Sequence, residues 1–195
     1  QCRQTMFIFS GSKRHTMSNM FNSSSKPFYQ SAITMGLSPI PADTYTMFAC
    51  RMFEEREKRI KPDVVEKVYQ KFDGCTWFVQ MIMNELFALT GQNECCEEDK
   101  IDTAWNNVIM TQESSYKDLL SHLAPKQKMM LLAIAKEGEA SEITSSAFIQ
   151  KYKLTSASSV QAAITPLIKN DLITKEENTY RVYDYFLAEW LRKEY

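Results

Sequence analysis

The sequence predicts a mainly α-helical protein that begins with the remnant of a parallel α/β sheet. Residues 6–9, Met-Phe-Ile-Phe, form a short apolar run without alternation, which is typical of a strand buried on both faces. From residue 42 onward, apolar side chains recur at helical spacing. Near the end, two short runs flank a turn at 176–178 and predict a β-hairpin. We therefore expect three domains: a two-strand sheet remnant at 1–40, a helical bundle at 41–113, and a helical unit with a hairpin at 114–195.

Composition excludes several classes of protein. The 195 residues are 44% hydrophobic and 24% charged, as in ordinary soluble globular domains. A formal net charge of -1 and a pI near 6.2 give no global attraction to nucleic acid or to an anionic membrane. No segment approaches the ~18 apolar residues that cross a bilayer. The five cysteines lack metal-ligand spacing and indicate reduced thiols, so we expect a cytoplasmic protein without a membrane partner.

The first 41 residues predict two strands separated by a loop. The apolar run at 6–9 stops at Ser-Gly-Ser, residues 10–12, and a basic cluster follows. The polar residues 18–26 are typical of an exposed loop. Alternating apolar residues at 33–37 indicate a second strand, which the prolines of 38–41 bring to an end.

Four apolar stripes predict a bundle of four short helices. Pro62 suits the start of the second helix, Gly74 its end, and Gly91 the end of the third. The acidic residues 97–99 favour the start of the fourth helix, because a helix N-terminus carries partial positive charge. The stripes consist, in order, of Tyr45, Phe48, Ala49, Met52 and Phe53; Val64, Val65, Val68 and Phe72; Phe78, Met81, Ile82, Leu86 and Leu89; and Ile101, Ala104, Trp105 and Val108.

The remaining residues have the element order of a winged helix-turn-helix: helix, helix, turn, helix, hairpin. Asp184 is placed to cap one further helix at the C-terminus. The expected elements are a helix over 116–123, a helix from Pro125 to Gly138, a short helix over 145–153, a helix over 155–170, strands over 172–174 and 180–182, and the closing helix after Asp184.

Catalytic constellations are missing from the sequence. The two histidines, His15 and His122, lie in unrelated settings and form no nucleophile–base pair. No G-x-x-x-x-G-K-[ST] loop is present to cradle phosphates, and no apolar run ends in the acidic pair that would hold magnesium. We therefore expect that this chain alone hydrolyses no nucleotide and binds no metal.

The corner at Gly11 and Ser12 is the remaining candidate for chemistry. Ligands of open α/β sheets bind beyond the carboxyl ends of the strands, where a small hydroxyl side chain can reach a phosphate oxygen or a water. A glycine there lets the backbone come close to the ligand. A plain turn with a helix cap is the alternative interpretation, and spacing alone leaves both open.

Several motifs together resemble a known family. They are Phe-Ile-Phe-Ser-Gly-Ser at 7–12, Met17, Lys-Pro-Phe-Tyr at 26–29, a strand followed by Pro-Ile-Pro at 39–41, and the closing helix at 182–191. In this order they resemble the second half of the archaeal-type ATPase domain, a branch of the P-loop ATPases close to the STAND group of the AAA+ superfamily. The resemblance runs from residue 5 to the end. It implies a sensor strand, a four-helix AAA+-type lid and a C-terminal winged helix.

The resemblance also implies where the partners of the first strand lie. They would belong to an upstream phosphate-binding half that this polypeptide lacks, so the N-terminal ATPase half is the expected partner. The full-length parent would then be an ATPase that uses ATP and Mg²⁺, whereas no cofactor is expected for this chain alone.

Nucleotide contacts follow from the same resemblance. Ser12 matches the sensor position near the terminal phosphate, and Gly11 and Arg14 would lie beside it. Gly74 and Thr76 match the lid segment that touches the base. The chain departs from the family pattern at two places, which puts an arginine contribution and the adenine contact in doubt. Gln-Ser stands at 30–31 where members often have Gly-Arg, and the Gly-Cys-Thr of 74–76 lacks a proline. Arg14 and Lys13 are also explained as solvated loop charges.

A further set of candidate residues, for docking to nucleic acid or to a partner, lies on the helix at 155–170. It consists of Ser156, Ser158, Ser159 and Gln161. These side chains could hydrogen-bond to a partner, but Lys169 is the only cation on that helix and the hairpin tip at 175–177 is net acidic. From Ser121 onward, ten Lys and Arg residues face nine Asp and Glu residues. Because phosphate neutralisation supplies most non-specific DNA affinity, docking to protein is favoured over DNA binding.

Three hypotheses of function remain. In the first, the chain is the sensor, lid and winged-helix portion of a cytoplasmic P-loop ATPase and acts as a nucleotide-dependent regulatory switch. In the second, it is a DNA-binding transcriptional regulator whose helical bundle serves as a dimerisation or effector domain. In the third, it is a helical adaptor without a ligand.

Overall fold

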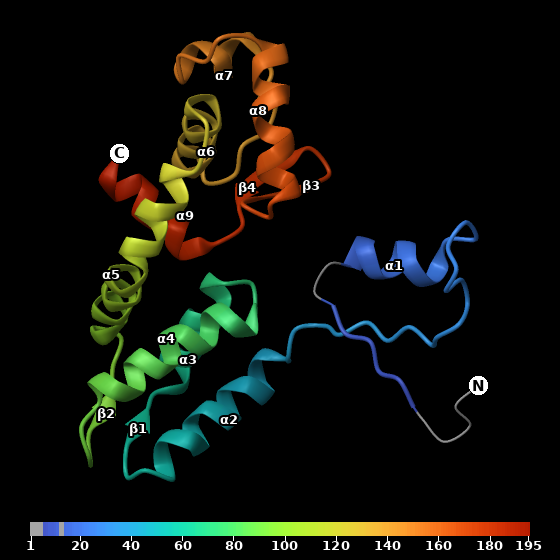
Figure 1. The fold of residues 1–195 in the computed structure, drawn as a ribbon. Coiled ribbons are helices and arrows are strands. Elements are labelled where there is room, and N and C mark those ends of the chain that lie inside the picture. The colour runs from blue at the N-terminus through green and yellow to red at the C-terminus, as the bar shows by residue number, and fades with distance from the viewer. Residues whose placement is uncertain (1–5, 12–13) are drawn as a thin grey trace. The chain divides into compact units, whose positions relative to one another are not determined.

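The computed structural model describes residues 6–11 and 14–195 and separates the chain into two compact units, 1–38 and 39–195 (Figure 1). The first contains one helix within the described residues, α1 (Arg14–Asn22). The second contains eight helices and two small sheets.

The two strands predicted in the first unit are wrong for the described residues of this chain. Residues 6–11 and 33–38 are extended without strand pairing, and Met6, Ile8 and Ile33 are 87%, 86% and 100% exposed. A strand is held by hydrogen bonds to its neighbours, and the described residues of this unit offer no neighbouring strand. The two apolar segments therefore have no strand to pair with among the described residues of this unit.

The loop predicted over 18–26 is helical in its first part, because α1 continues to Asn22. Phe21 is the buried residue of this helix, and its ring lies 5.4 Å from that of Phe9 and 6.2 Å from that of Phe28. This aromatic contact outweighs the polar composition that suggested a loop.

The first three helices of the bundle are confirmed as α2 (Ala42–Glu54), α3 (Pro62–Lys71) and α4 (Thr76–Leu89). Pro62 begins α3, as its fixed φ favours. The predicted stripes supply most of the core, with the exception of Phe48, which is 42% exposed. A short parallel pair, β1 (Arg59–Ile60) and β2 (Cys95–Cys96), was not predicted, because two residues are too few for a pattern.

Helix α5 (Lys100–Ser121) corrects the sequence analysis, which divided it into two helices. Residues 109–115 contain no glycine or proline, and Glu113 pairs with Lys117 at 2.6 Å across one turn. The apolar face continues through Ile109 and Tyr116, both of which are buried. Residue 113 lies inside α5, so the helical bundle and the C-terminal elements share this helix.

The winged helix-turn-helix is confirmed. It consists of α6 (Pro125–Glu137), α7 (Ser146–Lys151), α8 (Ala157–Lys169), the hairpin β3 (Ile173–Glu176) and β4 (Thr179–Val182), and α9 (Tyr185–Glu194). A bridge between Ala140 and Tyr180 extends the sheet beside β4. The Asp184 carboxylate accepts hydrogen bonds from the amides of Phe186 and Leu187, so the predicted cap is present.

An aromatic cluster joins the bundle to the winged helix, and we define it as Phe72, Phe78, Trp105, Tyr185 and Phe186. Phe72 stacks on Trp105 at 5.2 Å and lies 5.5 Å from Phe186. Phe78 lies 5.0 Å from Tyr185. Because the rings come from α4, α5 and α9 and from the residue after α3, the bundle and the winged helix are built around one core.

Candidate functional site

The predicted sensor corner lies only in part within the described residues. Gly11 is exposed, and a Cβ at this position would lie 2.9 Å from Met17 Sδ, so the glycine allows the side chain of α1 to approach. Ser12 and Lys13 lie outside the described residues, and Arg14 is the first residue of α1. A role for Gly11, Ser12 or Arg14 near phosphate stays a prediction.

Gly74 and Thr76 lie at the turn between α3 and α4. Asp73 and Gly74 both have positive φ, 50° and 69°, and Gly74 donates its amide to the carbonyl of Tyr69 at 3.0 Å. A Cβ on Gly74 would lie 2.6 Å from Tyr69 Cζ, which no side chain permits. The turn and the close ring therefore explain the glycine. Thr76 is exposed, and nucleotide contact at either residue stays a prediction.

An ionic cluster at the same turn was missed by the sequence analysis, and we define it as Asp73, Glu176, Arg181 and Tyr185. The Asp73 carboxylate accepts from Tyr185 Oη at 2.9 Å and from Arg181 Nη1 at 3.4 Å. Arg181 Nη2 lies 3.3 Å from Glu176 Oε1. Burial, followed by the bond to Asp73, raises the pKa of Tyr185 to about 12. Because more than 100 residues separate Asp73 from its partners, no sequence spacing could reveal the cluster.

Two exposed aromatic side chains flank this cluster. Trp77 is 55% and Tyr183 is 50% exposed, and their rings lie 4.8 and 6.2 Å from the ring of Phe78. Trp, Tyr and Arg are the residue types enriched at protein interfaces. The face formed by the start of α4 and the end of β4 therefore has the composition of an interaction surface.

The predicted docking residues lie at the N-terminus of α8. Ser156 Oγ accepts a hydrogen bond from the amide of Ser159 and so acts as the helix cap. Ser158 and Gln161 are exposed, whereas Ser159 is half-buried. The Ser158 hydroxyl lies within hydrogen-bond distance, 3.1 Å, of the capping Ser156 hydroxyl. Ser158 and Gln161 are thus the exposed members of the set whose side chains do not cap the helix.

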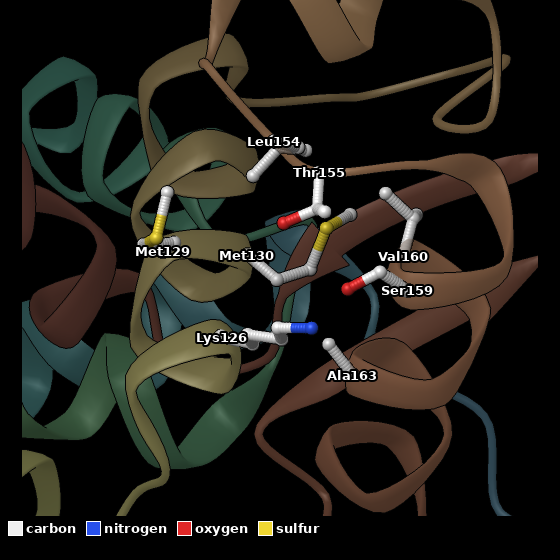
Figure 2. Close-up of a pocket in the computed structure, with 8 residues that line it drawn as sticks. All are labelled: Lys126, Met129, Met130, Leu154, Thr155, Ser159, Val160 and Ala163. Atoms are coloured by element: carbon white, nitrogen blue, oxygen red, sulfur yellow. The ribbon is translucent and has the colours of Figure 1, made fainter.

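A small hollow lies between α6 and α8 next to these residues. Figure 2 shows the Lys126 amine and the Ser159 hydroxyl facing each other across it, with the Met130 thioether behind. Its volume of about 10 Å³ accommodates one water molecule and no larger ligand. It is lined by Lys126, Met129, Met130, Leu154, Thr155, Ser159, Val160 and Ala163.

A larger groove runs between α2 and α4. Its volume is about 310 Å³, within the range of small-molecule sites, although the groove is open to solvent. Tyr45 Oη donates to Gln80 Oε1 at 3.2 Å, and Gln80 Nε2 donates to Asn84 Oδ1 at 3.0 Å. The exposed Phe48 forms part of the wall. The groove is therefore largely apolar with one row of polar groups.

The described residues contain no cluster of three or more His, Cys, Asp or Glu side chains that could hold a metal ion. Within the same residues, no helix has the length and apolar character needed to span a bilayer. A phosphate cradle of backbone amides and lysine is also missing from the sequence. Whether this chain takes part in binding Mg-ATP stays a prediction.

Comparisons with known proteins agree with this architecture. Residues 114–193 match a family model described as "Probable winged helix domain". Among solved structures, the Walker-type ATPase of Pyrococcus abyssi is similar to this chain, with a TM-score of 0.60, 20% identity, and coverage of 88% of this chain and 47% of that chain. The chain therefore spans about half the length of that ATPase. A comparison with curated proteins finds no match. At 20% identity the likeness shows a fold shared with this Walker-type ATPase.

Proposed function

We propose that this chain is the sensor, lid and winged-helix portion of a cytoplasmic P-loop ATPase, and that it acts as a nucleotide-dependent regulatory switch. The observation that carries the proposal is the shared fold over 88% of this chain with 47% of a Walker-type ATPase. Catalysis then requires a phosphate-binding half, which supplies the loop and the acidic strand that this sequence does not contain.

The exposed apolar segments of the first unit support this assignment. Met6, Ile8, Ile33 and Leu37 are each more than 80% exposed, which is unusual for large apolar side chains so close together in sequence. In the proposal these segments pair with strands of the phosphate-binding half, and the pairing satisfies their backbone groups and covers their side chains.

In the proposed assembly, ATP and Mg²⁺ are held by the phosphate-binding half, and the cofactor supplies the phosphoanhydride bond that is cleaved. Ser12 lies near the terminal phosphate and donates its hydroxyl, with Gly11 and Arg14 beside it. Thr76 and the turn at Gly74 contribute the lid. The aromatic cluster supports the switch, because a lid that shares a core with the winged helix carries it along when it moves.

The exposed side chains of α8 and the balanced charge favour protein docking through Ser158 and Gln161, with Ser156 and Ser159 shaping the helix start. A transcriptional regulator would instead need a cationic surface. A gel shift with random-sequence duplex at increasing salt separates the two, since a steep fall of affinity with salt would support DNA binding.

The test of the main proposal is calorimetric. Mg-ATP titrated into this chain should show no micromolar binding, whereas a polypeptide that joins the chain to its phosphate-binding half should bind it. In that polypeptide, Ser12→Ala should slow hydrolysis about tenfold or more, because a donor near developing charge is lost. Ser10→Ala, two residues earlier, is the control and should leave turnover unchanged. Micromolar ATP binding by this chain alone would contradict the proposal.

A further inference from the structure

A tyrosine of α3 holds the segment that precedes α2. Pro39, Ile40 and Pro41 precede α2, and the Tyr69 hydroxyl donates a hydrogen bond to the Ile40 carbonyl. The prolines have no amide hydrogen, so they cannot fix the segment by donating backbone hydrogen bonds. The Tyr69 ring also lies 6.0 Å from that of Tyr45, which places it against the first turn of α2. Tyr69 is therefore the clamp of this segment.

Tyr69 is in turn tied to the turn after α3. Its carbonyl accepts the Gly74 amide at 3.0 Å, and its ring packs so closely on Gly74 that a Cβ there would collide with it. A second bond, from the Cys75 amide to the Phe72 carbonyl at 2.9 Å, closes the same turn. With two consecutive residues at positive φ, this turn has few alternative conformations. A displacement of Asp73 or Gly74 is thus passed to Tyr69.

The winged helix holds the other side of this turn. Asp73, 71% exposed at its side chain, receives hydrogen bonds from Arg181 on β4 and Tyr185 on α9. Arg181 has a second partner, Glu176, on the neighbouring strand. That second pair lies within the hairpin and does not reach the turn.

We propose that Arg181, Tyr185, Asp73, Gly74 and Tyr69 form a relay through which the position of the winged helix controls the freedom of residues 39–41. Tyr185 and Arg181 hold Asp73, the Asp73–Gly74 turn positions the Tyr69 ring, and Tyr69 holds Ile40. A local shift of the β3–β4 hairpin and the start of α9 against the Asp73 turn weakens these bonds and releases residues 39–41. A regulatory role of the relay rests on the proposed function. The coupling between its residues can be tested without nucleotide.

The first experiment measures amide hydrogen exchange in a peptide covering residues 38–47 of the full chain. Tyr69→Phe removes only the hydroxyl, and exchange in this peptide should become about two- to tenfold faster, as expected for one lost hydrogen bond. Tyr152→Phe removes a comparable hydroxyl bond to Glu137 in the winged helix and should leave this peptide unchanged. Unchanged exchange in Tyr69→Phe would overturn the clamp.

The second experiment tests the relay itself. The double variant Arg181→Met with Tyr185→Phe keeps the stem and the ring but removes both bonds to Asp73, and exchange at 38–47 should again rise about two- to tenfold. Glu176→Gln, which removes the other partner of Arg181, is the control and should have no effect there. If the double variant destabilises the fold, Asp73→Gly gives the same test, because glycine has no side chain to accept these bonds and tolerates positive φ.

The outcomes of the two experiments are separable. Faster exchange in Tyr69→Phe combined with unchanged exchange in the wing variants would leave the clamp but refute the relay. A working relay in a protein that fails the ATP-binding test would refute the proposed function alone.

Discussion

Gly74 and Gly138 both have positive φ, 69° and 78°, but only one of them is also closely packed. A Cβ on Gly74 would lie 2.6 Å from the Tyr69 ring, whereas on Gly138 its nearest neighbour is Arg192 Nη1 at 3.8 Å. A substitution at Gly138 therefore adds mainly backbone strain, whereas one at Gly74 adds backbone strain and a steric collision.

The first prediction compares alanine at these positions. Gly138 has φ 78° and ψ −69°, a strained backbone conformation outside the left-handed helical region. Gly138→Ala should therefore lower the free energy of unfolding by about 1 to 2 kcal/mol through backbone strain alone. Gly74→Ala should cost about 3 kcal/mol, because the ring of Tyr69 must also move. Urea denaturation of both variants measures the difference. An equal loss of unfolding free energy in both variants would show that the Tyr69 ring moves aside at no cost, and would contradict the prediction.

The second prediction concerns Tyr185, whose pKa is raised to about 12. An unfolded tyrosine titrates near 10, so between pH 10 and 12 the folded state retains a proton that the unfolded state has lost. The stability due to Tyr185 is fully present below pH 10 and is lost as the pH rises towards 12. Between pH 10 and 12, the free energy of unfolding of Tyr185→Phe should therefore fall by about 1 to 2 kcal/mol less than that of the wild type. Thermal melts of both proteins at pH 9, 10 and 11 check the sign, and parallel curves would contradict it.

The ends of the helices contribute to stability as well as their buried faces. Ser156 caps α8 by accepting a hydrogen bond from the Ser159 amide at 3.2 Å. Ser158 is exposed and accepts no backbone amide, although its hydroxyl lies 3.1 Å from that of Ser156. The third prediction is that Ser156→Ala lowers the free energy of unfolding by about 1 kcal/mol. Ser158→Ala should change it by less than about 0.5 kcal/mol, as for an ordinary surface substitution. Chemical denaturation distinguishes them, and similar losses would mean that the cap is not what holds this helix end.

The helical elements could be predicted because each contains its own period of apolar residues. The stripe of α3, with Val64, Val65 and Val68, is buried as expected. The strands at 6–9 and 33–37 were wrong for this chain, because pairing depends on neighbours that sequence periodicity cannot supply. The division of α5 at residue 114 was also wrong. Residues 111–115 are mostly polar but contain no glycine or proline, so the helix continues through them.

Residues 39–195 form one compact unit, in which the aromatic cluster links α4, α5 and α9 with the residue after α3. The fourth prediction is that Phe72→Ala lowers the free energy of unfolding by about 3 to 5 kcal/mol. Trp105 in the bundle and Trp190 in the winged helix should report one shared transition. Phe48→Ala, at a position 42% exposed, is the control and should cost much less. Two separate transitions would show that the bundle and the winged helix unfold independently.

The candidate site was predictable only where its residues are close in sequence. The turn at Gly74 and the start of α8 at Ser156 follow from local chemistry and lie where they were expected. The partners of Asp73 lie 108 and 112 residues away, so the ionic cluster depends on the packing of the winged helix against the bundle. The fold brings such groups together, and a pattern within one segment does not contain that information.

The bare apolar stretches of the first unit have a practical consequence for handling the protein. Met6, Ile8, Ile33 and Met35 expose large apolar side chains on backbone that, within the described residues of this unit, pairs with no strand. Such surfaces adhere to one another and template intermolecular sheets. Purified in isolation, the polypeptide should tend to self-associate and to retain chaperones, and deletion of these stretches should yield better-behaved material.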